Sequence, residues 1–231
     1  MCSSDLFTIT RAVTPIAGLE LVQNETAASG GQDAEVPTEA AKRAPQLFRT
    51  MGRAVTAADY EEHSKQFGVG KARARSGGWN RIELFVAPAG GGQPSDTLKE
   101  DLRSYFEKKR IMTAILDVRD PTYVNVFIEG KLEIEAYYFA QQIQQQAQNK
   151  VTEILAFEAV DFEDKLYLSK VYEAIESIEG VKGVHISRFA RLDSTRDLPE
   201  NGTLTFGWSE IPIAGHAIGI SLTVTGGRLD Q

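Results

Sequence analysis

The clearest pattern in the chain is an alternation of apolar and polar residues between positions 124 and 136. Every second position holds an apolar residue or glycine, without a slip: Val124, Val126, Ile128, Gly130, Leu132, Ile134 and Ala136. A period of two is typical of a β-strand with one buried face. A hairpin turn at Glu129–Gly130 is the alternative, but the unbroken parity favours one long strand. Gly130 is then expected at a bulge or a close approach of backbone.

Two helices and a returning strand are predicted after this long strand. The first helix runs from about residue 138 to 157, and the second ends at Gly180, a residue type that commonly follows a helix end. Their inward positions are Ile143, Ala147, Val151 and Ile154 in the first, and Leu168, Val171, Tyr172, Ile175 and Ile178 in the second. Val184 and Ile186 begin the returning strand. This order predicts helices covering one face of a sheet.

A capped helix is predicted over residues 52–67. Thr56 is placed to cap the first turn, and Asp59 stands three residues later, where an acid completes a capping box. Val55 and Tyr60 occupy the positions of an apolar staple at the helix start. The preceding segment is predicted to be helical and to end at Gly52. Strand-like sequence follows Gly68.

A second α/β pattern lies between this helix and residue 119. Residues 81–87 alternate as a half-buried strand, residues 88–94 form a glycine-rich loop, and Ser95 caps a further helix. Residues 114–118 read as another strand. The predicted fold class is therefore α/β (α+β), with two small α/β layers, short helices and mixed sheets.

The carboxy-terminal residues 192–231 are predicted to form a β-hairpin or arm. Ile218, Ile220, Leu222 and Val224 alternate, and Leu204 to Trp208 are strand-like. We expect this arm and the long helices to supply contact surfaces. Removal of residues 193–231 should then abolish self-association or assembly while leaving the α/β body folded. The predicted domains are 1–36 (a strand and Gly-rich linker), 37–119, 120–191 and 192–231.

Composition narrows the function classes. The chain has 231 residues, 42% hydrophobic and 25% charged, as in an ordinary soluble globular protein. The net charge of -7 argues against a chain that mainly binds nucleic acid, because phosphate contacts need an excess of Lys and Arg. Cys2 is the single cysteine, so no internal disulfide is possible. No apolar run approaches the length of a membrane span, and we expect no membrane partner.

Candidate metal and catalytic residues do not converge in the sequence. His63, His185 and His216 lie in three separate segments, and surface or packing roles are favoured for them. The acidic residues Asp161 and Asp164, with Glu163 between them, lack the pattern of a calcium loop, so a solvated loop or helix cap is favoured. We therefore predict no catalytic residues, no metal site and no cofactor.

Two further motifs each have a functional and a structural interpretation. Gly90–Gly92 lies between a strand and a helix, where phosphate loops occur, but no GxxxxGK[ST] or GxGxxG pattern is present, and a turn is favoured. Lys71, Arg73 and Arg75 alternate along one strand. They lack the interleaved aromatic residues of a nucleic-acid site, so a charged edge strand or the rim of a protein interface is favoured.

The linear order of short motifs resembles the baseplate J-like proteins of contractile phage tails and related injection systems. The resemblance covers roughly residues 21–227, and its first motifs are Asn24–Gly31, Asp33–Glu35, Arg43–Pro45, Arg53–Thr56 and Asp59–Tyr60. The family's loop at Val86–Gly92, the basic helix end at residues 108–110, Asp120–Pro121 and Gly180–Val184 follow in order. The matching positions are Gly30, Gly31, Arg53, Val55, Thr56, Asp59, Tyr60, Pro88, Gly91, Gly92, Gly180 and Gly183.

The resemblance implies a structural, non-enzymatic protein. Such proteins form baseplate wedges, associate with copies of themselves and with other wedge and hub proteins, and form a ring whose rearrangement is linked to sheath contraction. The implied location is the tail baseplate of a virion assembled in the host cytoplasm, and the motif positions are expected to determine the fold. Since the family usually has earlier domains, we expect an amino-terminally truncated chain. The alternative is a small α/β ligand-binding or regulatory module that uses the glycine loop as its pocket.

Overall fold

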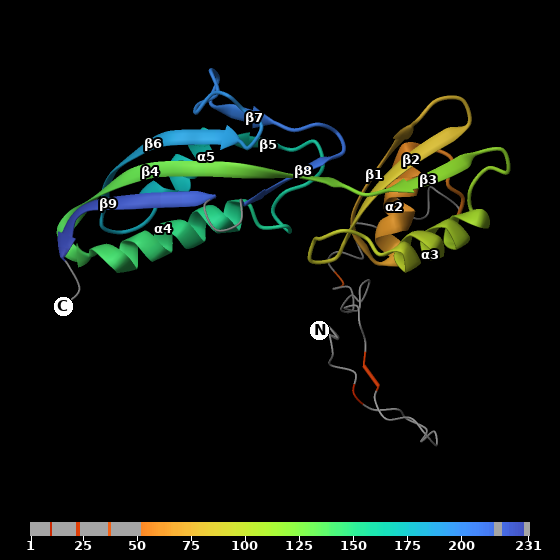
Figure 1. Ribbon diagram of the computed structural model, residues 1–231, viewed down its shortest axis with the longest axis horizontal. Coiled ribbons are helices and arrows are strands. Elements are labelled where there is room, and N and C mark those ends of the chain that lie inside the picture. The colour runs from red at the N-terminus through yellow and green to blue at the C-terminus, as the bar shows by residue number, and fades with distance from the viewer. Residues whose placement is uncertain (1–9, 11–21, 24–36, 38–51, 215–218, 229–231) are drawn as a thin grey trace. The chain divides into compact units, whose positions relative to one another are not determined.

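The chain divides into two compact units, unit 1 (Met1–Asp120) and unit 2 (Pro121–Gln231), in a computed structural model (Figure 1). The structure describes residues 10, 22–23, 37, 52–214 and 219–228. Gly30, Gly31, His216 and the predicted helical segment before Gly52 therefore fall largely outside the described residues.

Unit 1 is a three-stranded sheet with two helices. Its elements are α2 (Ala57–Phe67), β1 (Val69–Ser76), β2 (Arg81–Pro88), α3 (Asp96–Glu107) and β3 (Ile115–Arg119). The sheet order is β1-β2-β3, with β1 antiparallel and β3 parallel to β2. This arrangement confirms the predicted α/β pattern and each of its strands and helices to within a few residues.

The start of α2 has the predicted capping box. The Thr56 hydroxyl accepts from the Asp59 amide at 3.2 Å, and the Asp59 carboxylate accepts from the Thr56 amide at 2.8 Å. Gly68 ends the helix with a left-handed φ of 107°. Tyr60 is buried, whereas Val55 is 55% exposed, so the predicted staple does not bury both residues.

The core of unit 1 lies between the sheet and its two helices. Leu84 and Val86 from β2 are fully buried and pack with Leu102 and Phe106 of α3. The rings of Tyr60 and Phe106 lie 5.1 Å apart between their centroids, which joins α2 to α3. Leu84 and Val86 are buried as predicted, but β2 is not half-buried, because Glu83, Phe85 and Ala87 on its other face are buried as well.

Unit 2 is organised around one long strand. Its elements are β4 (Thr122–Phe139), α4 (Ala140–Ile154), β5 (Lys165–Tyr167), α5 (Leu168–Glu176), β6 (Val181–Arg191), β7 (Thr203–Thr205), β8 (Glu210–Ala214) and β9 (Ile220–Arg228). The predicted unbroken strand is confirmed, and the hairpin at Glu129–Gly130 is excluded. A register shift occurs between Glu129 and Gly130, and a Cβ on Gly130 would lie 2.9 Å from the His185 carbonyl oxygen. The bulge and the close approach are therefore both present.

The strands of residues 192–231 do not form a hairpin or arm. β8 and β9 both pair with β4, in parallel, at residues 122–126 and 128–134 respectively. They complete the sheet opposite β6, while β7 pairs with the short strand β5, which the sequence pattern did not predict. Leu222 of β9 is buried in the unit 2 core. The hairpin prediction was wrong because alternation shows that a segment is a strand but does not identify its partner.

Helix α4 starts later than predicted, because β4 continues through Phe139, and it ends sooner, at Ile154. Helix α5 starts at Leu168 and ends at Glu176, before the predicted end at Gly180. Ile143, Ala147 and Val151 are buried as expected. In Figure 1, α4 runs along β9, and the Gln144 side chain donates to the Leu222 carbonyl oxygen at 2.6 Å. This contact satisfies a backbone acceptor of the edge strand.

Candidate assembly surface

The sequence-predicted motif residues lie at three separate places. Arg53, Val55, Thr56, Asp59 and Tyr60 surround the start of α2. Pro88, Gly91 and Gly92 lie in the loop before α3, where the Gly91 amide donates to the Pro88 carbonyl at 3.0 Å. Gly180 and Gly183 lie in unit 2. Thr56 and Asp59 cap a helix, Pro88 and Gly91 form a turn, and Gly183 lies within β6, so the described motif residues have no common structural role.

Gly180 has a clear local reason to be glycine. Its φ is 97°, and an added Cβ would lie 2.6 Å from the Tyr138 ring. Gly183, three residues later, has open space at the same position. The structure therefore separates a glycine that the fold requires from one that it tolerates.

The candidate histidines and acidic residues that the structure describes do not form a common site. His63 is 2% exposed and packs edge-on to Tyr105 and Phe106, and its Nε2 has no hydrogen-bond partner among the described residues. His185 is exposed. Asp161 and Asp164 hold backbone amides of their own loop. Within the described residues, no group of three or more His, Cys, Asp or Glu side chains could hold a metal ion. None of the described helices is long and apolar enough to cross a bilayer.

The basic strand β1 lies at a sheet edge, as predicted. Arg75 pairs with Glu83 at 2.7 Å, and the Glu61 carboxylate accepts from the Ala74 backbone amide at 2.9 Å. Lys71 is only 8% exposed, although a solvated edge would expose it. Both the charges and the Glu61 contact oppose pairing of β1 with another strand.

The most exposed large apolar side chains of unit 1 lie on two tight turns. The first turn joins β1 to β2 and carries Trp79, which is 94% exposed. The Gly77 amide donates to the Arg81 carbonyl at 2.9 Å, and the Arg81 amide donates to the Gly78 carbonyl at 3.3 Å. Asn80 has a φ of 55°, and tight hairpin turns of the types that match the twist of the strands require such a positive φ. The turn therefore presents Trp79 on a fixed backbone.

The second turn precedes β3 and carries Met112, which is also 94% exposed. The Ala114 amide donates to the Ile111 carbonyl at 2.9 Å, and the Arg110 guanidinium donates to the Ala114 carbonyl. The Ile115 amide donates to the Asn80 carbonyl at 2.6 Å, which ties the second turn to the first. Both turns lie where β2 and β3 begin, at one end of the sheet (Figure 1).

These two turns and the chain before α2 form what we call the apolar tip. Its members are Val55 (55% exposed), Trp79, Ile111 (48%), Met112 and Ile115 (55%). Val55 and Ile111 line one small pocket together with Asn80 and Arg81, and Ala54 forms a β-bridge with Arg110. Exposed apolar patches with polar surroundings are typical of protein–protein interfaces. The apolar tip is therefore the candidate assembly surface of unit 1.

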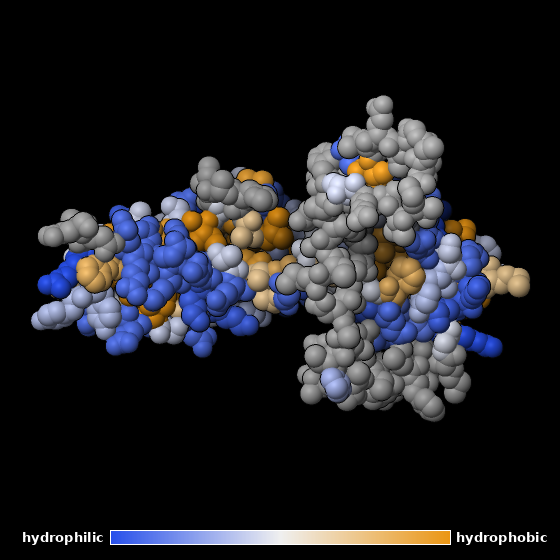
Figure 2. Space-filling view, turned by 90° about the horizontal axis from the view of Figure 1, so that it is seen from below, coloured by the Kyte–Doolittle hydropathy of each residue, from blue (hydrophilic) through white to orange (hydrophobic). Residues whose placement is uncertain are grey.

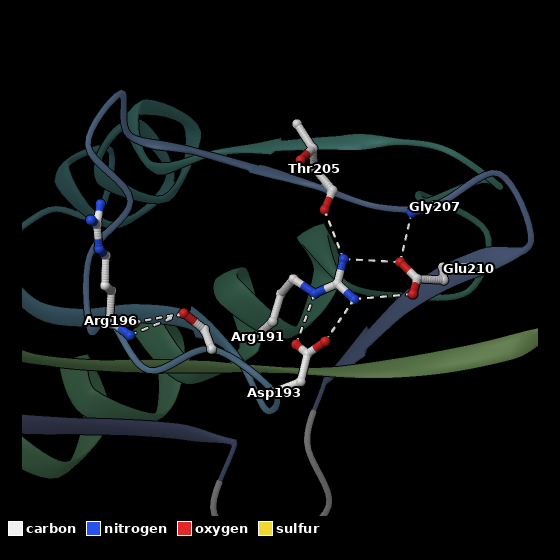
Figure 3. A network of polar contacts seen from close by, with 7 residues as sticks. Arg191, Asp193, Arg196, Thr205, Gly207 and Glu210 are labelled. Carbon is white, nitrogen blue, oxygen red and sulfur yellow. Dashed lines mark hydrogen bonds and ion pairs between the residues drawn. The ribbon is translucent and has the colours of Figure 1, made fainter.

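Unit 2 contains a dense ionic network around Arg191 at the end of β6 (Figure 3). The Arg191 guanidinium donates to both oxygens of Asp193, at 2.9 and 3.0 Å, and to both oxygens of Glu210, at 2.9 and 3.0 Å. It also donates to the Thr205 carbonyl at 2.9 Å, and its cationic carbon lies 5.3 Å from the Phe206 ring centre. One side chain thus ties β6 to the end of β7 and the start of β8.

The two carboxylates respond to this network in the same direction. Burial alone would raise the pKa of Glu210, but the hydrogen bonds from Arg191 and the Gly207 amide outweigh burial and lower the pKa below its ordinary value. The Arg191 hydrogen bonds lower the pKa of Asp193 as well. The arrangement favours charged carboxylates, which suits a structural clamp rather than a proton donor.

Comparison with known proteins finds a family model that matches part of unit 1. Residues 52–119 match the family model described as Baseplate J-like central domain. This match spans α2 to β3 and includes the whole apolar tip. We refer to residues 52–119, by this similarity, as the J-like domain. The prediction of a baseplate J-like protein is confirmed.

A solved structure gives a similar fold over more of the chain. The match is to a chain of the cryo-EM structure of the anti-feeding prophage (AFP) baseplate, 6-fold symmetrised, with a TM-score of 0.59 and 15% sequence identity. It covers 87% of this chain and 46% of that chain, so this chain spans less than half of its length. At this identity the likeness concerns the fold. No curated protein matches the chain.

Sequence reasoning missed the apolar tip of the J-like domain. Trp79 is an isolated apolar residue in polar turn sequence, and Met112 stands in the short apolar run Ile111–Met112 after a basic helix end, so neither belongs to a motif. A Trp in a Gly-Gly-Trp-Asn turn was the one usable signal, because a large apolar side chain in a turn has no core to enter. The meeting of the two turns depends on the parallel pairing of β2 with β3, which sequence alone does not state.

Proposed function

We propose that this chain is a structural, non-enzymatic component of the baseplate of a contractile tail or related injection system. The observation that carries the proposal is the apolar tip on a baseplate J-like central domain, with Trp79 and Met112 each 94% exposed. Exposed Trp is among the residues most enriched at the energetic centres of interfaces. In a baseplate, a neighbouring subunit covers the apolar tip and removes it from water.

The finer role that we propose is that of a wedge protein. The chain assembles with copies of itself and with other wedge and hub proteins into a ring around the hub. It transmits the rearrangement that triggers sheath contraction, and it is located in the tail baseplate after assembly in the host cytoplasm. The anti-feeding prophage baseplate, which contains the chain of similar fold, was symmetrised sixfold, and a ring of repeated subunits is consistent with this role.

The apolar tip suits a contact that must be strong but specific. Its two turns are held by backbone hydrogen bonds before any partner arrives, so little conformational entropy is lost on binding. Arg81, which is 48% exposed, lies beside the apolar residues and favours a partner with nearby carboxylates, whereas Arg110 is already paired with Glu107 at 2.6 Å. Apolar area supplies affinity, and the charges select the partner.

The test replaces the tip side chains in the organism or phage that carries this gene. We expect the double substitution Trp79→Ser and Met112→Ser to stop baseplate assembly, because it removes most of the exposed apolar area without touching the core. Electron microscopy of the purified particles measures the fraction with complete baseplates. Circular dichroism of the purified chain checks that the fold is retained.

The matched control is Asp96→Ser on α3, because the Asp96 side chain is also almost fully exposed, at 98%, but lies outside the tip. We expect the control to assemble normally. Complete baseplates in the tip variant, at the level of the control, would contradict the proposal that the tip is an assembly contact.

A further inference from the structure

The J-like domain and unit 2 carry opposite net charge. Residues 52–119 have 12 Lys and Arg against 9 Asp and Glu, whereas residues 121–231 have 9 against 16. The overall charge of -7 therefore conceals a basic J-like domain and an acidic unit 2. Two copies of the chain can attract each other through unlike units, and contact between like units is disfavoured.

Unit 2 has a groove between α4 and α5 that could receive a large side chain. The groove holds about 410 Å³ and is lined by Lys150, Glu153, Ile154, Lys170, Glu173, Ala174 and Ser177. Ile154 and Ala174 contribute apolar surface to the groove, and Glu173 contributes a carboxylate. Lys150 and Lys170 also line it, and the Lys150 ammonium pairs with the Glu153 carboxylate at 3.7 Å. This volume falls within the usual range for sites that hold a small molecule or a bulky side chain.

The groove differs from the rest of the α4 surface. Figure 2 views the molecule from the α4 side, where unit 2 is largely hydrophilic. Exposed glutamines contribute to this surface: Gln141, Gln142, Gln145 and Gln146. A neutral polar surface offers little to an apolar partner, so the groove is the place on these two helices where an apolar side chain gains most from burial.

We propose that the α4–α5 groove of one copy receives Trp79 of a second copy. This inference rests on the proposed function, because it names the neighbour that covers the apolar tip. Trp79 contributes a flat apolar ring, and Arg81 at the base of the same turn meets the carboxylate of Glu173, because Glu153 is already paired with Lys150. The basic J-like domain of one copy then lies on the acidic unit 2 of the next.

The contact joins two different surfaces, so it is heterologous. Each copy that receives a tryptophan in its groove still has its own tip to offer to the following copy. Head-to-tail contacts of this kind generate rings when the rotation closes. One repeated contact between the apolar tip and the groove therefore links successive copies head to tail.

The decisive experiment is disulfide trapping between two differently tagged full-length chains. Cys2 is replaced by Ser in both chains, one chain carries Trp79→Cys, and the other carries Ser177→Cys at the groove. Each chain then has one cysteine, so a covalent heterodimer contains a disulfide between positions 79 and 177. We expect this heterodimer to form when the two chains are mixed under mild oxidation. Gel electrophoresis without reductant measures its yield.

The matched control chain carries Asp96→Cys instead of Trp79→Cys, since that side chain is exposed elsewhere on the J-like domain. We expect its heterodimer yield with the groove chain to be at least tenfold lower. Equal yields from positions 79 and 96 would overturn the tip-in-groove contact.

Charge reversal tests the same contact without cysteines. We expect Arg81→Glu and Glu173→Lys each to weaken self-association about tenfold in sedimentation at low salt, and the chain with both changes to recover most of the loss. A loss that the double change does not recover would contradict the pairing. If these tests fail while tip variants still block baseplate assembly, the proposed function stands and a different protein covers the tip. If the tip variants assemble normally, the proposed function fails as well.

Discussion

The two units of this chain build similar layers of helix on sheet by different means. In the J-like domain, β1, β2 and β3 come from one stretch of 51 residues, Val69–Arg119, and helices α2 and α3 lie next to the strands they cover. In unit 2, the central strand β4 takes β8 and β9 as partners, and β9 begins more than 80 residues after the end of β4. The first unit depends on nearby segments, and the second depends on strands that return from the end of the chain.

This difference changes what a local alteration does. Removal of the chain end leaves every described strand of the J-like domain in place, but it removes one side of the unit 2 sheet. The strand pairing therefore predicts, against the expectation from sequence, that removing residues 193–231 unfolds unit 2, whereas unit 1 is still expected to stay folded.

The largest predicted effect comes from deleting residues 209–231. We expect unit 2 to unfold, because β4 loses both parallel partners and buried side chains such as Leu222 and Ile211 are lost with them. The backbone amides of the J-like domain should stay protected from hydrogen exchange. Amide hydrogen exchange measured by mass spectrometry reports the two units separately. A chain lacking only residues 229–231 is the control, and retained protection of β4 in the longer deletion would contradict the comparison.

The next effect is expected from Gly180→Ala in unit 2. The φ of 97° is strained for alanine, and the new Cβ would meet the Tyr138 ring at 2.6 Å, so the free energy of unfolding should fall by about 2–4 kcal/mol. Urea unfolding followed by far-UV circular dichroism measures the change. Gly183→Ala has open space at the same atom and should change stability by less than about 0.5 kcal/mol. Equal losses for both variants would show that the Tyr138 contact is not the cause.

The Arg191 clamp gives a third, smaller effect. Arg191→Met should lower the free energy of unfolding of unit 2 by about 1–3 kcal/mol, because Glu210 and Asp193 lose their charged partner. The exposed pair Arg196–Glu200 provides the control, and Arg196→Met should cost under about 0.5 kcal/mol.

The same clamp predicts a pH dependence. Folding lowers the pKa of Glu210 below its ordinary value of 4.5. The contribution of its carboxylate to the free energy of unfolding is therefore complete above pH 4.5 and is lost as the pH falls through the lowered pKa of the folded state. Glu210→Gln should flatten the decline in unit 2 stability over that acid range. Thermal unfolding at a series of pH values measures the slope, and an unchanged slope would contradict the role given to Glu210.

The smallest effect is expected in the J-like domain at the start of α2. Thr56→Ala removes the hydroxyl that accepts from the Asp59 amide, so the free energy of unfolding of this domain should fall by about 1 kcal/mol. Thr56→Ser keeps the hydroxyl and should retain most of that stability. Hydrogen exchange in α2 measures the change. A loss confined to unit 2 would contradict the independence of the two units.

The local elements of this protein follow from its sequence. Periodicity indicates which residues of β4 face a core, and the capping residues Thr56 and Ser95 fix where α2 and α3 begin, because these features depend on neighbours within a few residues. The order of short motifs in the sequence alone also indicates similarity to the J-like family.

The way in which distant segments combine depends instead on tertiary packing. Alternation in residues 220–224 predicts a strand, but the choice of β4 over a hairpin partner depends on long-range contacts that a local pattern does not contain. The Arg191 clamp and the apolar tip also depend on tertiary packing, because each joins residues from different segments and no local sequence pattern indicates that these segments meet. The candidate assembly surface is therefore a product of strand pairing: β2 and β3 begin side by side, and Trp79 and Met112 stand exposed together at that end of the sheet.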